Sequence, residues 1–165
     1  SDQRGSYIWN SVMDSRSVNN YRFSVYRKEV HFLAWKTLYA QGSFPNVVSD
    51  EKEFNKIFEI VAGKGNGPVI LRRECWDCPS PWDLIYVTLR NNTVWENPYS
   101  SLLECWVHDD GKTGTPRGFL KDFNLYSSFE DVQAGSNPWR YCNGGDYGVG
   151  FPRDCAPRSD QRGSY

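Results

Sequence analysis

The heptapeptide SDQRGSY occurs twice in this 165-residue chain, at 1–7 and again at 159–165. The two copies begin at Ser1 and Ser159, which gives a repeat period of 158 residues. Units that stack into solenoids have periods of roughly 20 to 50 residues, because one such unit cannot bury its hydrophobic face alone. The much longer period predicts instead that each unit folds as a separate domain with its own core.

A tag added at both ends, a duplication scar or a tandem array could each produce such a repeat, and the tandem array is favoured because the heptapeptide matches no common affinity or protease tag. A tandem array also predicts a domain organisation and a mode of assembly. We expect a single globular domain over 8–158, with 1–7 and 159–165 as junction segments between successive units. A head-to-tail contact that does not close into a ring produces an open filament. The predicted partners are therefore neighbouring copies of the chain. The junction residues are Ser1, Asp2, Arg4, Tyr7, Ser159, Asp160, Arg162 and Tyr165.

The composition excludes two classes of partner. Lys and Arg number 19 and Asp and Glu number 20, so the net charge of −1 offers no basic surface for nucleic acid. Membrane insertion is not expected, because no apolar run approaches the roughly 18 residues that a spanning helix needs.

Aromatic residues make up 16% of the chain, which is typical both of rigid domains and of surfaces that bind sugars.

Two helices are predicted in the N-terminal half. The first covers 27–41, where apolar residues recur at helical spacing and Gly42 follows as a C-terminal cap. The second begins after Asp50, which has Glu53 three residues later as in a capping box, and it ends at Gly63. The apolar residues of the two helices are Val30, Leu33, Ala34 and Leu38, then Phe54, Ile57, Phe58 and Val61.

Alternating apolar and polar residues predict strands in the rest of the chain. These segments are 21–26, 68–75, 84–89, 101–108 and 118–126. From Asp131 onward Gly and Pro dominate and predict a loop-rich tail. The predicted fold class is therefore α+β, with the two N-terminal helices packed on a mostly antiparallel sheet and disulfide bonds holding the tail.

Five cysteines suggest an extracellular, disulfide-bonded protein with one thiol left over. If 68–75 and 101–108 are neighbouring strands, Cys75 and Cys105 lie on the same apolar face and can form a disulfide. Cys142 and Cys155 would then close the tail, and Cys78 would be free or bonded to another chain. A secreted location also makes Asn91, in the acceptor sequence Asn-Asn-Thr, a candidate glycosylation site.

A zinc site is the alternative use of these cysteines. Cys75 and Cys78 form a Cys-x-x-Cys pair, and Cys105 with His108 forms a Cys-x-x-His pair, which together supply four ligands. A zinc knuckle requires a tight turn, however, and both pairs carry a bulky Trp there. The disulfide interpretation is favoured, and no cofactor is expected.

No catalytic constellation stands out. His31 and His108 are the only histidines, and His31 lies within the predicted first helix, where a packed histidine is the ordinary interpretation. The Asp109-Asp110-Gly111 sequence after His108 is common in turns, although it could also bind a cation. The sequence therefore predicts a domain that is not an enzyme.

Aromatic residues in loops are the candidate binding surface. Trp95, Trp139, Tyr141 and Tyr147 lie beside Asn, Gly or Asp, which gives flat rings with polar edges, although such rings also anchor loops to a core. We expect a secreted repeat unit of a fibre, sheath or matrix protein. The alternatives are a carbohydrate-binding domain that uses these aromatic residues, a zinc-stabilised module and a small secreted hydrolase.

Overall fold

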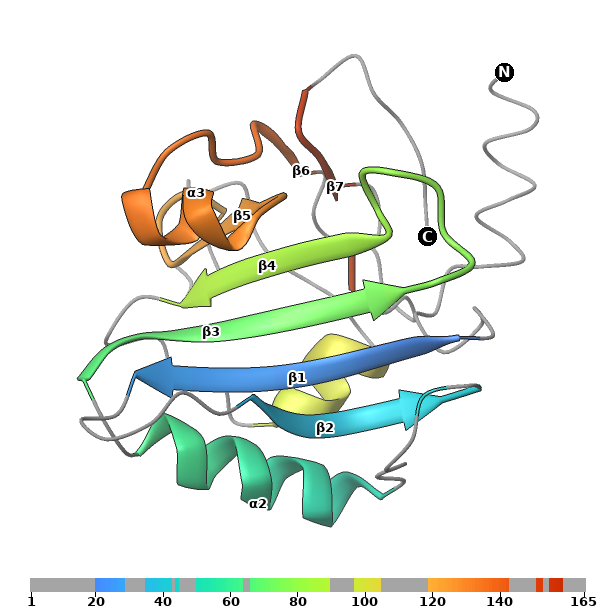
Figure 1. Ribbon diagram of the computed structural model, residues 1–165. Helices are drawn as coiled ribbons and strands as arrows, with labels where there is room; N and C mark the ends of the chain where they lie inside the picture. Colours follow the sequence, from blue (N-terminus) through green and yellow to red (C-terminus); the bar gives the residue numbers. More distant parts are fainter. Residues whose placement is uncertain are drawn as a thin grey trace.

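The computed structural model describes residues 20–28, 35–42, 44, 50–63, 66–89, 97–104, 119–142, 151–152 and 155–158. Five strands form an antiparallel sheet in the order β2-β1-β3-β4-β5, and two short strands pair separately (Figure 1). The sheet strands are β1 Tyr21–Lys28, β2 Lys36–Gln41, β3 Asn66–Cys75, β4 Leu84–Leu89 and β5 Phe123–Tyr126. The other elements are α2 Glu51–Ala62, the short π-helix η2 Ser100–Glu104, α3 Phe129–Ala134, β6 Tyr141–Cys142 and β7 Cys155–Ala156. The predicted α+β class with a mostly antiparallel sheet is confirmed.

Alternating side chains determine the two faces of the central strands. In β1, Tyr21, Phe23 and Val25 are completely buried on the inner face. Across from them in β3 lie Cys75, Arg73 and Leu71. Strand β4 adds Ile85, Val87 and Leu89 to the same core, as its alternation predicts. The outer face carries a smaller cluster built from Tyr26, Ile70, Tyr86 and Tyr126.

The predicted helix over 27–41 is wrong in its described part. Residues 27–28 complete β1, and Lys36–Gln41 forms the edge strand β2, paired antiparallel with β1. Leu38 and Ala40 are buried while Thr37 and Tyr39 are only partly so, which is the period of a strand. The exposed edge of β1 offers backbone partners that no local pattern reveals. Residues 29–34, including His31, lie outside the described residues.

The second predicted helix is confirmed as α2. The Asp50 carboxylate accepts a hydrogen bond from the Glu53 N–H at 2.7 Å, which caps the first turn. Gly63 caps the other end. Phe54 and Phe58 are buried against β1 and β2, and Ile57 and Val61 pack beside them. Figure 1 shows α2 running along the β2 edge of the sheet.

The predicted strand over 101–108 is wrong where the structure describes it. Residues 100–104 form η2, in which the adjacent Leu102 and Leu103 are both buried, whereas a strand would place them on opposite faces. The preceding Tyr99 packs edge-on against Phe54 of α2, with the ring centroids 5.4 Å apart. Residues 105–108 lie outside the described residues.

The last sheet strand is shorter than predicted. Only Phe123–Tyr126 forms β5, because the chain turns at 120–122 and Leu120 has a positive φ of 64°. Phe119 still reaches the core and lies 5.6 Å from the Phe123 ring. The 118–126 prediction is therefore confirmed only in its second half.

The C-terminal tail contains more regular structure than expected. It includes α3, capped by the Ser128 side chain at one end and by Gly135 in the left-handed conformation at the other. Of the two α-helices in the described part of the chain, one therefore lies in the C-terminal half, whereas both were predicted in the N-terminal half. Helix α3 packs on β4 and β5 (Figure 1). The predicted Cys142–Cys155 disulfide is confirmed and joins β6 to β7.

Candidate functional site

The turn between β3 and β4 is closed by a disulfide between Cys75 and Cys78. Cys75 is the last residue of β3, and its N–H donates to the Asp83 carbonyl at 2.8 Å across the base of the turn. Inside the turn, the Cys78 N–H donates to the Cys75 carbonyl at 3.4 Å, and the Trp82 N–H donates to the Pro79 carbonyl at 2.8 Å. These bonds hold residues 75–83 as a compact loop.

This pairing overturns the predicted roles of Cys75 and Cys78. Cys75 is bonded to Cys78 and not to Cys105, and Cys78 is therefore not a free or interchain thiol. The prediction required a strand over 101–108 beside β3, but residues 100–104 form η2, and β3 lies between β1 and β4. Cysteines three residues apart in a turn are already within bonding reach, with Cα atoms 5.4 Å apart.

The alternative zinc site is not compatible with this pairing. Zinc binds thiolates, and the sulfurs of Cys75 and Cys78 are joined to each other. Within the part of the chain that the structure describes, no group of three or more His, Cys, Asp or Glu side chains is placed to hold a metal ion. Cys105 and His108 lie outside that part.

Trp76, inside the disulfide turn, is the most exposed large hydrophobic residue described, at 63% of its surface. Its ring centroid lies 4.2 Å from that of the buried Phe44. The Arg22 guanidinium lies 4.9 Å from the centroid of the same Phe44 ring. Because Phe44 fixes one side of the indole, the rest of the ring is presented to solvent in a defined orientation.

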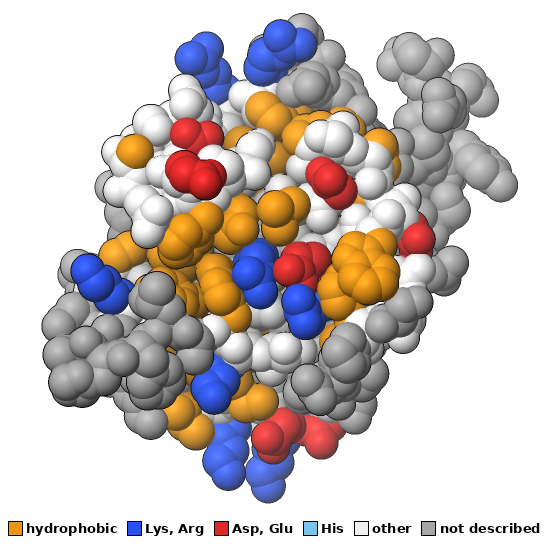
Figure 2. Space-filling model, viewed as in Figure 1, with side chains coloured by type: hydrophobic (Ala, Val, Ile, Leu, Met, Phe, Trp, Pro, Cys, Tyr) orange, Lys and Arg blue, Asp and Glu red, His pale blue; other side chains and the backbone are white. Residues whose placement is uncertain are grey.

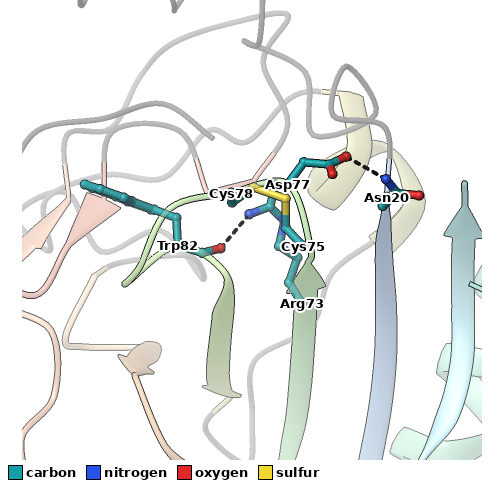
Figure 3. The surroundings of a disulfide bond; sticks show 6 residues. All are labelled: Asn20, Arg73, Cys75, Asp77, Cys78 and Trp82. Atoms are coloured by element: carbon teal, nitrogen blue, oxygen red, sulfur yellow. Dashed lines mark hydrogen bonds between the residues drawn. A yellow bond between two sulfur atoms is a disulfide. The ribbon is translucent and has the colours of Figure 1, made fainter. Parts of the chain in front are cut away.

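Two polar pairs border this exposed ring. The Arg22 Nε donates to Glu74 Oε2 at 2.7 Å. The Asn20 amide donates to Asp77 Oδ2 at 2.8 Å, and Figure 3 shows this second pair. The backbone N–H of Trp76 donates to the Asn20 carbonyl at 2.9 Å. We call this surface the Trp76 patch; it comprises Asn20, Arg22, Phe44, Glu74, Trp76 and Asp77.

Hydrophobic and charged side chains continue across the outer face of the sheet. The Arg72 guanidinium lies 4.2 Å from the centroid of the Trp35 ring, and its Nε lies 3.3 Å from Glu74 Oε1. Phe129 of α3 packs against Trp35 and Tyr86. Figure 2 shows the resulting surface, with basic and acidic side chains at its middle and hydrophobic ones around them. This face is therefore amphipathic.

Arg73 lies on the opposite face of β3 and is completely buried. Its Nη1 donates to the Trp82 carbonyl at 3.1 Å, while Nε and Nη2 have no hydrogen-bond partner among the described residues. The guanidinium also lies 5.9 Å from the centroid of the Tyr21 ring. Burial lowers the pKa of Arg73 to about 10, partly opposed by Tyr21, so the side chain is still a cation at neutral pH.

Figure 3 shows the Arg73 side chain running along Cys75 toward the disulfide, with its bonded nitrogen directed at the Trp82 carbonyl. No carboxylate pairs with this cation in the described part of the chain, and buried charges are ordinarily paired. The interior beside the disulfide therefore holds positive charge and two guanidinium nitrogens that have no partner among the described residues.

Trp82 connects the two disulfide regions. Its carbonyl accepts from Arg73, and its indole Nε1 donates to the Cys155 carbonyl at 2.8 Å. The β3–β4 turn and the stapled tail therefore pack as one unit around a buried Trp.

The predicted aromatic contacts divide into two groups. Trp139 is 1% exposed, and its indole donates to Ser127 Oγ at 2.7 Å, so it anchors the tail and the prediction of a ligand contact is wrong for it. Tyr141 in β6 is half-buried. Trp95, Tyr147, the glycosylation candidate Asn91 and all residues of the two junction segments lie outside the described residues.

Sequence reasoning missed both Trp76 and Arg73 as site residues. The signal for Arg73 was available, since alternation along 68–75 places it on the same face as Leu71 and Cys75. The exposure of Trp76 had no such signal, because it depends on the pairing of Cys75 with Cys78. Comparison of the chain with protein-family models, curated proteins and solved structures finds no match. None of the described helices is long and apolar enough to cross a membrane.

Proposed function

We propose that this chain is a non-enzymatic interaction domain that associates with neighbouring copies of itself through the Trp76 patch. The observation that carries the proposal is the 63% exposure of a Trp held on a disulfide-closed turn. Tryptophan and arginine dominate the binding energy of protein interfaces, because a large ring buries much apolar area at little cost in side-chain entropy. The cost is smaller still here, since Phe44 already orients the indole.

The repeated heptapeptide gives this association a direction. Identical segments at 1–7 and 159–165 suit a tandem protein in which successive units touch head to tail. Contacts of this kind between different surfaces extend into an open filament where their rotation does not close a ring, as a fibre, sheath or matrix requires. The proposed location is extracellular. The two disulfides in the structure are compatible with it, and Asn91 is its proposed glycosylation site.

Sedimentation velocity on the single chain and on a two-unit tandem tests this proposal. We expect concentration-dependent association that weakens at least tenfold in Trp76→Ser. The matched control is Leu120→Ser, because Leu120 is also a large exposed hydrophobic residue, at 45%, but lies outside the patch. Association that is absent in the parent chain, or equally weakened by both substitutions, would count against the proposal.

A carbohydrate-binding domain is the second candidate. It is favoured by the polar pairs Asn20–Asp77 and Arg22–Glu74, since hydroxyl groups of a sugar stacked on Trp76 could exchange bonds with them. A glycan array discriminates the two functions. Trp76-dependent glycan binding by a chain that remains monomeric would support this candidate over self-association.

A further inference from the structure

We propose that the Cys75–Cys78 disulfide is a thiol–disulfide exchange site, which accepts two electrons from a protein or peptide dithiol. Three observations carry this inference. They are the short loop that the bond closes, the unequal burial of its two cysteines, and the buried cation beside it, which has no carboxylate partner among the described residues.

The first observation separates this bond from a structural staple. Cys75 and Cys78 are only 3 residues apart, whereas Cys142 and Cys155 are 13 apart. The entropy that a disulfide removes from the unfolded chain grows with the length of the loop. The turn is also held by hydrogen bonds that do not involve sulfur, such as the one from the Cys75 N–H to the Asp83 carbonyl. Opening this bond therefore leaves the sheet intact.

The second observation determines which sulfur is attacked. Cys75 is completely buried at the end of β3, whereas Cys78 is 8% exposed and lies between the exposed residues Asp77 and Pro79. An incoming thiolate must approach along the axis of the sulfur–sulfur bond. Attack therefore falls on the Cys78 sulfur, and Cys75 becomes the leaving group.

The third observation explains why that leaving group departs readily. The Arg73 side chain runs along Cys75 to the disulfide (Figure 3), and its Nε and Nη2 have no partner among the described residues. The positive charge of the Arg73 guanidinium, together with its N–H groups that have no partner among the described residues, would stabilise a thiolate forming on Cys75. A leaving thiol of lowered pKa departs faster, and a stabilised reduced form makes a disulfide a stronger oxidant.

The reaction is balanced without any other oxidant. One substrate thiolate attacks the Cys78 sulfur, the Cys75–Cys78 bond breaks, and its electron pair goes to Cys75. The second substrate thiolate then attacks the substrate sulfur of this mixed disulfide and releases the Cys78 thiolate. The substrate dithiol is oxidised to a disulfide, and the Cys75–Cys78 disulfide is reduced to a dithiol, which takes up the two protons. Trp76, exposed between the two cysteines, supplies a contact surface for the substrate.

Equilibration in mixtures of reduced and oxidised glutathione tests the site, on the full chain carrying Cys105→Ser so that the fifth thiol cannot shuffle the bonds. Acid quenching, alkylation and mass spectrometry then report each cysteine pair separately. We expect the Cys75–Cys78 pair to be reduced at a potential at least about 30 mV higher than the Cys142–Cys155 pair, which is a tenfold difference in equilibrium constant. The quenched glutathione adduct should lie on Cys78.

Substitution of Arg73 tests the role of the buried cation. Arg73→Met should lower the potential of the Cys75–Cys78 pair by about 30 mV, equivalent to tenfold, and leave the other pair unchanged. Arg72→Met is the matched control, because Arg72 is adjacent in sequence but pairs with Glu74 on the outer face, and it should shift neither pair.

The outcomes divide clearly. Equal potentials for the two disulfides, a glutathione adduct on Cys75, or equal effects of the two arginine substitutions would overturn the proposal. If Arg73→Met does not fold, the two reduction potentials and the position of the glutathione adduct in the parent chain still test the proposal.

A synthetic peptide with two cysteines should be oxidised with a stoichiometry of one peptide disulfide per chain, and Cys78→Ser should abolish this reaction.

Discussion

The two disulfide regions of this domain use the same bond in different surroundings. Cys142–Cys155 joins β6 to β7 across 13 residues and fastens a tail that has little core of its own. Cys75–Cys78 closes a turn of the sheet across 3 residues, below an exposed Trp and beside a buried arginine. Both regions meet at Trp82. The contrast illustrates the proposed exchange reaction: loop length and neighbouring charge, more than the bond itself, would determine whether a disulfide stabilises a fold or reacts.

The largest expected difference lies between the two tryptophans of these regions. Trp139→Ala should lower the free energy of unfolding by about 3 to 5 kcal/mol, because it leaves a cavity beneath the tail. Trp76→Ala should change it by no more than about 0.5 kcal/mol, since the side chain is mostly in solvent. Guanidinium chloride denaturation of both variants measures the difference. Similar losses in the two would contradict the assignment of Trp139 as the anchor and Trp76 as the contact.

Removal of each disulfide is expected to have the next largest effect on the free energy of unfolding. Replacing both Cys142 and Cys155 by Ser should cost about 3 kcal/mol, the value for a loop of roughly 15 residues. Replacing Cys75 and Cys78 should cost about 2 kcal/mol or less, because the loop is shorter. Denaturation curves in the Cys105→Ser background provide the comparison. A greater loss at the β3–β4 turn would show that this bond, too, is a staple.

Substitution of Arg73, beside the Cys75–Cys78 bond, is expected to increase stability, whereas the preceding substitutions decrease it. Arg73→Met should raise the free energy of unfolding by about 1 kcal/mol, because it replaces a buried cation that has no counter-ion in the described part of the chain by an apolar side chain of similar length. Burial lowers the pKa of Arg73 to about 10, which gives a second readout. Above about pH 10 the unfolded chain binds more protons than the folded one, so this group should make stability rise with pH there, and the rise should vanish in Arg73→Met. A destabilised Arg73→Met would indicate a structural role for the cation.

The smallest effect on stability is expected from a substitution beside the N-terminal cap of α3, near the tail. The pKa of Asp131 is held below its usual value mainly by a hydrogen bond from the Asn137 amide and also by Ser136 and Ser128. A lowered folded pKa means that this stabilisation is present above the unfolded pKa and is lost as pH falls through the folded one. Asn137→Ala should therefore shift acid unfolding to slightly higher pH, as circular dichroism would detect. Cys75 and Cys78 variants should show no such shift.

Local signals predicted a large part of the fold. The capping residues Asp50 and Gly63 gave the limits of α2, and alternation gave β1, β3 and β4 with the correct inner faces. The Cys142–Cys155 pairing also followed from the sequence, because a Gly- and Pro-rich tail has few other means of being held. Each of these signals depends on residues that are close together in the chain.

The candidate site was mostly beyond such signals. Trp76 stands out only once Cys75 is known to pair with Cys78, and the sequence instead paired Cys75 with Cys105 because it placed a strand over 101–108 beside 68–75. Likewise, the spacing of apolar residues over 27–41 fitted a helix, yet residues 36–41 add to the open edge of β1. Propensity could not decide these cases, because the deciding partners lie in other parts of the chain.

The sequence alone therefore determined the α+β class, the helix caps and the faces of the central strands, since hydrophobic period and cap chemistry act over a few residues. Only the tertiary structure decided that residues 36–41 join the sheet as an edge strand and that residues 100–104 form η2. These depend on which segments become neighbours, and that is determined by the packing of the whole core.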